Sequence, residues 1–107
     1  MHPKRLSRDD ILALQKGGRR ISTPLFLIYS KPGRFSRSRI AITISKKEEE
    51  TAVGRNRIKR RLRHALRSVI KNKHLNTQDV FIVARGQVKK VAWNELLRIT
   101  ENSMLKR

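Results

Sequence analysis

The sequence predicts a two-layer α+β sandwich in which helices cover a small mixed sheet. Apolar residues recur at three- and four-residue spacing in some segments, as on one face of a helix, and form short runs or alternate in others, as in strands. These segments follow one another in the order α-β-β-α-β-α, and strands flanked by helices pack as layers around one core. A chain of 107 residues has room for a single domain, so we expect residues 1–107 to form one.

The first helix is predicted to begin at Ser7, after a flexible basic arm at residues 1–6. A serine side chain caps helix N-termini well, and the helix dipole favours Asp9 and Asp10 in the first turn. Gly17-Gly18 ends the helix, since glycine is common just past a helix C-terminus. The apolar face is short and consists of Ile11, Leu12 and Leu14.

Three segments are predicted to be strands. Leu25–Tyr29 is rich in strand formers, and Arg39–Ser45 alternates between isoleucine and other residues with the period of two that strands have. Turn residues at Lys31–Gly33 lie between these two segments, which suggests that they form an antiparallel hairpin. The third segment, Asp79–Arg85, is mostly apolar and is predicted to lie at the centre of the sheet.

A long helix is predicted from Val53 to Lys71 and a last helix from Ala92 to Leu105. In the long helix, apolar residues at 3.6-residue spacing form one stripe, which we expect to pack on the sheet. The stripe consists of Ile58, Leu62, Ala65, Leu66, Val69 and Ile70. The opposite side collects Asn56, Arg57, Arg60, His64, Arg67 and Lys71, with Arg63 at its edge. The residues of the last helix that are expected to turn inward are Trp93, Leu96, Leu97 and Met104.

The charge of the chain favours a polyanionic partner. There are 27 Lys and Arg residues against 8 Asp and Glu, a formal net charge of +19, and confining this charge in one small domain costs self-repulsion. Nucleic acid is the leading partner class; an anionic membrane surface ranks second, because no amphipathic anchor is evident. The absence of cysteine excludes disulfides, cysteine zinc sites and a thiol nucleophile. Without an apolar run of about 20 residues or a secretory signal, we expect a soluble, cytoplasmic protein with no membrane partner.

The long helix is the strongest candidate for a phosphate-binding element. A merely solvated charged face would mix signs and pair acids with bases four residues apart, but no acid occurs from Thr51 to Gln78. Like charges at this spacing are mildly destabilising, and Arg57–Arg61 and Lys59–Arg63 are examples. A helix that carries this cost is expected to face phosphate, and its arginines suit bidentate phosphate contacts.

Other candidate sites are weaker. Phe26 and Tyr29 lie three residues apart, so one ring is expected in the core and the other exposed, where it could stack on bases beside Arg39, Thr43 and Ser45. The residues alone slightly favour the alternative that both rings are packing residues. His2, His64 and His74 have no spacing typical of a metal site or a general base. Glu48–Glu50 could in principle bind Mg²⁺ but is better interpreted as a solvated acidic run. No catalytic residue and no metal site on the chain is expected.

Several segments together resemble the bacterial ribonuclease P protein family. The run Arg55-Asn56-Arg57-Ile58-Lys59-Arg60-Arg61-Leu62-Arg63 is similar to the arginine-asparagine-arginine signature of that family. The resemblance extends over roughly residues 6–105. It includes Ser45-Lys46-Lys47, Ala52-Val53 and Val83-Ala84-Arg85, and the N-terminal pattern of Asp10, Ile11, Gly18, Phe26 and Tyr29.

This resemblance implies a function and a set of site residues. The family's protein is the auxiliary subunit of an endoribonuclease in which a catalytic RNA removes the 5′ leader of precursor tRNA with Mg²⁺ held mainly by the RNA. A 1:1 holoenzyme and a left-handed β-α-β crossover through the long helix, as in a domain of a ribosomal protein, are also implied. The implied RNA-binding residues are Arg55, Asn56, Arg57, Lys59, Arg60, Arg63, Arg67, Lys46 and Lys47. The implied leader cleft is lined by Ile11, Gln15, Phe26, Tyr29, Arg39 and Ser45.

Two departures from the family pattern and two alternatives remain at this point. Ile11 and Gln15 stand where family members often carry aromatics, so Tyr29 is expected to carry more of the base stacking; the acidic run Glu48–Glu50 is also atypical. A structural RNA-binding protein of the ribosomal type is the main alternative function. A helix-turn-helix DNA regulator would need two short helices around a tight turn, which the strand-rich segments on either side of the long helix do not offer.

Overall fold

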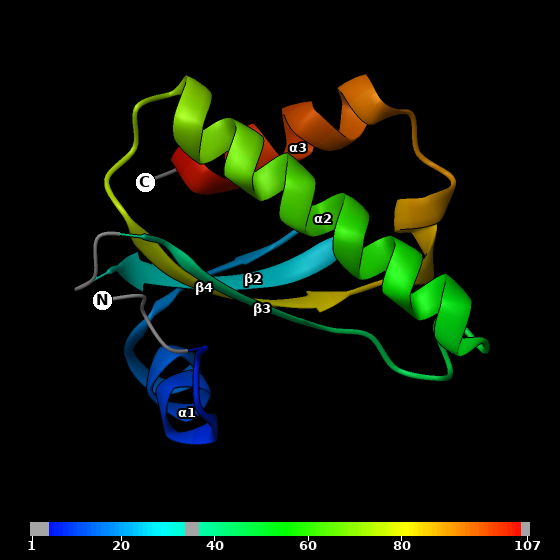
Figure 1. Ribbon diagram of the computed structural model, residues 1–107, viewed down its shortest axis with the longest axis horizontal. Helices are drawn as coiled ribbons and strands as arrows, with labels where there is room; N and C mark the ends of the chain where they lie inside the picture. Colours follow the sequence, from blue (N-terminus) through cyan, green and yellow to red (C-terminus); the bar gives the residue numbers. More distant parts are fainter. Residues whose placement is uncertain (1–4, 34–36, 106–107) are drawn as a thin grey trace.

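The computed structural model describes residues 5–33 and 37–105, which form two helical layers around one sheet (Figure 1). The sheet order is β1-β2-β4-β3. The elements are α1 (Arg8–Gly17), β1 (Arg19–Ser22), β2 (Phe26–Pro32), β3 (Arg39–Thr43), α2 (Ala52–Asn72), β4 (Gln78–Ala84), the 3₁₀ turn η1 (Gly86–Lys89) and α3 (Trp93–Leu105). The predicted α+β class and the central position of β4 are confirmed. Of the predicted basic arm, only Arg5 and Leu6 lie within the described residues.

The strand pairing differs from the predicted hairpin. β2 pairs antiparallel with β1 and with β4, and β3 pairs parallel with β4, so β2 and β3 are not neighbours. β4 takes the central place because its residues are buried on both faces of the sheet, whereas Thr43 on β3 is exposed. The hairpin that does form joins β1 to β2. The sequence Arg-Arg-Ile-Ser of β1 was not recognised as a strand because it carries one apolar residue.

The core lies between the sheet and α2, with α3 packed beside α2 on the same face (Figure 1). Ile28 on β2 and Ile82 on β4 are paired in register and fully buried. The predicted apolar stripe of α2 is confirmed, except that Ile70 is only half-buried. None of the helices in the described part of the chain is long and apolar enough to cross a bilayer.

On the other face of the sheet, α1 lies as a separate element (Figure 1). Its predicted cap is confirmed: the Asp10 backbone N–H donates to Ser7 Oγ at 3.1 Å, and the Ser7 N–H donates to Asp10 Oδ2 at 2.9 Å. Gly18 caps the C-terminus of the helix, and its N–H donates to the Leu14 carbonyl at 2.8 Å. Leu14 is the fully buried residue of α1, so this helix contacts β2 and β4 over a small area and leaves much of its surface exposed.

Candidate nucleic-acid interface

The buried stripe of α2 divides its cations into two flanks and a crest. Each residue advances about 100° around a helix, so residues four apart lie nearly above one another. Asn56 and Arg60 lie on the exposed crest, opposite the stripe. The flank toward β3 consists of Lys59, Arg63 and Arg67, which we call the β3 flank. The flank toward η1 and α3 consists of Arg57, Arg61 and His64, which we call the α3 flank.

The β3 flank forms one wall of a cationic groove of about 740 Å³. β3 is an edge strand, so the floor of the groove also offers backbone groups that no neighbouring strand pairs with. None of the described residues that line the groove is acidic, and the cations of the β3 flank are therefore not neutralised within it. The lining residues are Arg5, Leu6, Arg37, Ser38, Arg39, Ile40, Ala41, Ile42, Lys59, Arg63 and Arg67. Such a groove suits a phosphate backbone.

Arg55 differs from the other implied RNA ligands, because part of its side chain is used inside the protein. Its Nη1 donates to the carbonyl oxygens of Glu49 at 3.0 Å and Glu50 at 2.8 Å. Thr51 caps the same helix end, where its Oγ1 accepts from the Gly54 N–H at 2.9 Å. Arg55 therefore fixes the β3–α2 loop against the first turn of α2.

The acidic run in the β3–α2 loop is not simply solvated, which corrects the prediction for Glu49. The Glu49 side chain is buried and forms an ion pair with Lys89 on η1. It also accepts a hydrogen bond from Thr51 Oγ1 at 3.2 Å. Glu48 Oε1 accepts from the Gly86 N–H at 3.0 Å. A Cβ at Gly86 would lie 2.4 Å from the Glu48 carbonyl oxygen, so a glycine is needed where the loop approaches η1. The run thus joins the loop to η1, while Lys46 and Lys47 remain exposed.

The open face of the sheet carries the aromatic residue that was expected to meet the leader. Tyr29 is half-buried there and stacks on Phe81 of β4, with ring centroids 6.2 Å apart and an interplanar angle of 25°. On α1, Ile11 is half-buried and Gln15 exposed. Phe26 cannot line the same cleft, because alternation along β2 puts it on the α2 face, where it is fully buried. Its assignment to the leader cleft is therefore wrong.

Arg39 also has a different role from the predicted one. It is 8% exposed, and its Nε and Nη2 donate to the two carboxylate oxygens of Asp79 at 3.0 and 2.8 Å, while Nη1 donates to Asp10 at 3.3 Å. The hydrogen bonds to Asp79 raise the pKa of Arg39. Hydrogen bonds from Ser7 and the charge of Arg39 lower the pKa of Asp10. Arg39 thus connects β3, β4 and α1 through its hydrogen bonds. Ser45, another residue implied for the leader cleft, lies just beyond β3 and is exposed.

Comparison with known proteins shows to which family the whole chain, including the cationic helix α2, is related. The family model for ribonuclease P matches residues 3–107. This chain belongs to the ribonuclease P protein family. The "Ribonuclease P protein component" of Streptococcus thermophilus is 32% identical over 87 residues, which cover 81% of this chain and 76% of that protein. That of Synechococcus elongatus is 46% identical over 63 residues, 55% of this chain and 52% of that protein.

Solved ribonuclease P proteins share the fold. The protein from Staphylococcus aureus superposes with a TM-score of 0.72 at 24% identity, covering 92% of this chain and 88% of that one. The protein from Thermotoga maritima gives a TM-score of 0.70 at 23% identity, covering 94% and 97%. The four-stranded mixed sheet with its flanking helices, described above for residues 5–33 and 37–105, is therefore the ribonuclease P protein fold.

Sequence reasoning missed the contacts on the α3 flank of this chain. Arg61 Nη1 donates to the Val88 carbonyl on η1, and the Arg61 guanidinium carbon lies over the Trp93 ring at 6.0 Å from its centroid. Trp93 itself is 36% exposed, so the prediction that it turns inward is wrong. Its spacing of three from Leu96 is the spacing of core residues, which is why the pattern alone could not distinguish the two positions.

The Glu49–Lys89 pair gives the stability of this chain a defined pH dependence. The hydrogen bond from Lys89 holds the pKa of Glu49 below its ordinary value of 4.5. A lowered folded-state pKa stabilises the fold fully above the unfolded pKa, and this contribution is lost as the pH falls through the folded pKa. We expect Glu49→Gln to lower the urea midpoint near neutral pH, and the difference from the parent protein to shrink as the pH falls below 4.5. Urea unfolding across this pH range measures both effects.

Glu50→Gln is the matched control, because Glu50 is an exposed neighbour whose backbone carbonyl, and not its carboxylate, contacts Arg55. It should leave the midpoint nearly unchanged at every pH. A Glu49→Gln loss that does not depend on pH would show that the pair's charge is not what stabilises the loop.

Proposed function

We propose that this chain is the protein subunit of ribonuclease P, which assists a catalytic RNA in removing the 5′ leader of precursor tRNA. Membership of the family supports the assignment to ribonuclease P. The observation that carries the mechanism is the β3 flank of α2 above a groove whose described lining holds no acid. The role of this chain is therefore electrostatic and geometric, with the chemistry in the RNA.

The catalytic RNA is the partner of α2 in this proposal. The phosphates of this RNA lie along the groove and contact Lys59, Arg63 and Arg67. The same RNA strand, or the one next to it, contacts Asn56 and Arg60 on the crest of α2. Lys46 and Lys47 extend the cationic surface along the loop that precedes α2. Each neutralised phosphate releases counterions, so binding should weaken as salt rises.

The 5′ leader is proposed to lie between α1 and the open face of the sheet. Tyr29, stacked on Phe81, offers an aromatic surface on the sheet, and Ile11 and Gln15 of α1 are proposed to line the opposite side of the leader site. A single strand binds such a surface by stacking its bases and placing its phosphates among cations. Arg39 acts here by holding α1 against the sheet, which sets the width of the cleft, and not by contacting the leader directly.

Magnesium is proposed to be held by RNA. Among residues 5–33 and 37–105, no three His, Asp or Glu side chains come together as a metal site, and Asp79 and Glu49 are paired with Arg39 and Lys89. Mg²⁺ binds phosphate oxygens readily and keeps several waters. We also propose that one protein binds one RNA. The relatives come from bacteria, in which precursor tRNA is made in the cytoplasm, so a cytoplasmic location is part of the proposal.

The proposal is tested by leader removal at two Mg²⁺ concentrations. Cations on α2 offset repulsion between the two RNAs, and extra Mg²⁺ can replace that effect. Arg60→Ala should therefore reduce leader cleavage by the reconstituted holoenzyme several-fold at low Mg²⁺ and much less at high Mg²⁺. The readout is the rate of 5′ leader release from labelled precursor tRNA.

Lys73→Ala is the control, because it removes one charge near the far end of α2, where Lys73 pairs with Glu101. It should cleave like the parent protein at both concentrations. Equal loss for Arg60→Ala at both concentrations would reject the charge-offset mechanism. Failure of the parent protein to stimulate the RNA at all would favour a structural RNA-binding protein of the ribosomal type.

A further inference from the structure

Trp93 is placed unlike an ordinary core tryptophan. It is the first residue of α3, and 36% of its surface is exposed. The buried positions of α3 are Leu96, Thr100 and Ser103, which face α2 and the sheet. A large aromatic ring that remains partly exposed beside a cationic helix exposes apolar area to water unless something covers it.

Two polar side chains of α2, Arg61 and His64, contact the Trp93 ring. The Arg61 guanidinium lies over the ring, 6.0 Å from its centroid, within the range of a cation–π contact. His64 meets the ring edge-on, with centroids 5.5 Å apart and an interplanar angle of 65°. Both residues come from the α3 flank of α2. Neither stacks flat on the indole as a second aromatic ring would.

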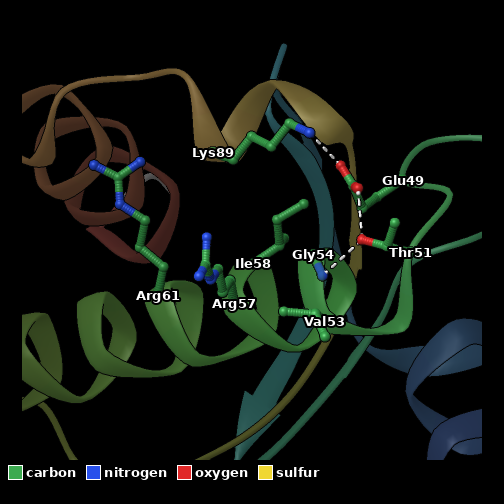
Figure 2. A pocket seen from close by; sticks show the side chains of 8 residues that line it. All are labelled: Glu49, Thr51, Val53, Gly54, Arg57, Ile58, Arg61 and Lys89. Atoms are coloured by element: carbon green, nitrogen blue, oxygen red, sulfur yellow. Dashed lines mark hydrogen bonds and ion pairs between the residues drawn. The ribbon is translucent and has the colours of Figure 1, made fainter.

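Arg61 is held in place and links Trp93 to a pocket. Its Nη1 donates to the Val88 carbonyl, which fixes the guanidinium between η1 and α3. The same side chain lines a pocket of about 470 Å³ between η1 and the start of α2, which we call the α2–η1 pocket. Figure 2 shows Arg57 and Arg61 rising from the same side of α2, with Lys89 above them on η1.

The charge of the α2–η1 pocket favours an anion. Its acidic lining residue, Glu49, is already paired with Lys89 and hydrogen-bonded to Thr51. Arg57 and Arg61 are therefore not neutralised by Glu49. The floor is apolar and includes the buried Ile58. An exposed indole in contact with Arg61, which lies one helical turn from Arg57, combines two groups that proteins use for unpaired nucleotides: a ring that stacks on a base and cations that bind phosphate.

We propose that Trp93 is a stacking platform for an unpaired RNA nucleobase, and that Arg57 and Arg61 bind the phosphate next to it in the α2–η1 pocket. This site lies on the opposite flank of α2 from the groove beside β3, so one helix would contact RNA on both sides. The proposal deepens the proposed function, on which it rests for the identity of the RNA. It does not depend on where the leader binds.

Trp93 is the only tryptophan of the chain, so its fluorescence reports on this site alone. We expect a single-stranded oligoadenylate to quench the Trp93 emission on binding, because a stacked base lies against the indole. An oligonucleotide of the same length with abasic sugars carries the same phosphates and no bases. It should bind through the cations with little quenching.

Two substitutions separate stacking from packing. Trp93→Phe keeps an aromatic ring and should retain most of the affinity for oligoadenylate, measured by anisotropy of a labelled strand. Trp93→Leu keeps apolar volume without a π-face, and should weaken oligoadenylate binding about fivefold or more. Its affinity for the abasic strand should not change. Urea unfolding of each variant verifies that it is folded under the conditions of the binding measurement.

The outcomes decide between a binding site and a structural residue. The decisive quantity is the affinity for oligoadenylate divided by the affinity for the abasic strand. If Trp93 is purely structural, this ratio will be the same for the parent protein and for Trp93→Leu, and that result would overturn the proposal. Equal quenching by both strands, or no binding of oligoadenylate, would overturn it as well. Leader cleavage with ribonuclease P RNA is measured separately, so loss of stacking and failure of the proposed function give different results.

Discussion

Asp79→Ala is expected to lower the free energy of unfolding by about 3–5 kcal/mol, the usual cost of removing one partner of a buried ion pair. Asp79 is 1% exposed and meets Arg39 through two parallel hydrogen bonds. Its loss leaves a buried guanidinium with the more distant Asp10 as its described carboxylate partner. Domains of this size have about 5–15 kcal/mol of stability in total. The variant should therefore approach the limit of folding at physiological temperature.

Urea denaturation with Asp9→Ala as a control measures this effect. Asp9 is also an acid and lies in the first turn of α1, but it is exposed, and its removal should cost little. The double variant Arg39→Met with Asp79→Val replaces the pair by apolar residues of roughly similar volume and should recover most of the loss. A loss below about 1 kcal/mol for Asp79→Ala would mean that water or another group compensates the guanidinium.

The Arg39 network also shows why the role of Arg39 could not be predicted from the sequence. Alternation along β2 correctly placed Phe26 and Tyr29 on opposite faces, and Tyr29 is the accessible one. The sequence does not say that Arg39 lies opposite Asp79, because those residues are 40 positions apart and meet only through the β3–β4 pairing. A surplus of cations gives no indication of which ones are occupied by carboxylates inside the fold.

Local signals were more reliable than pairings between distant segments. The apolar stripe of α2 and the cap at Ser7 depend on residues within one or two turns, and both are confirmed. The β2–β3 hairpin was wrong, because turn residues at Lys31–Gly33 permit a hairpin but do not require one. β4 is apolar on both faces, so it is buried most completely at the centre of the sheet. Pairing of β2 and β3 with β4 therefore stabilises the sheet more than pairing of β2 with β3 would.

The same limit applies to the two flanks of α2. Helical spacing alone separates Lys59, Arg63 and Arg67 from Arg57 and Arg61. It does not show that one flank faces the edge strand β3 and the other faces η1 and Trp93. The partner elements differ, and so should the chemistry: phosphates along the β3 flank, and a base with its phosphate along the α3 flank.

Replacing Lys59, Arg63 and Arg67 together by glutamine is expected to weaken binding of the ribonuclease P RNA roughly 100-fold at about 0.1 M salt. The three side chains line one groove with no described acid among its lining residues, so each is available to a phosphate. Each phosphate contact contributes about 0.7–0.9 to the slope of log affinity against log salt, and the slope should fall by about 2–3. The difference from the parent protein should therefore shrink at high salt.

The matched control removes the same number of charges at the other edge of the sheet. Lys16, Arg19 and Arg20 are exposed on α1 and β1, and their replacement by glutamine changes the net charge equally. If affinity for the RNA follows net charge alone, both triple variants will lose it to the same extent and with the same salt slope. A loss confined to the β3 flank would mean that the RNA follows the groove beside β3. The position of the cations on α2, and not their number in the chain, would then determine where the RNA binds.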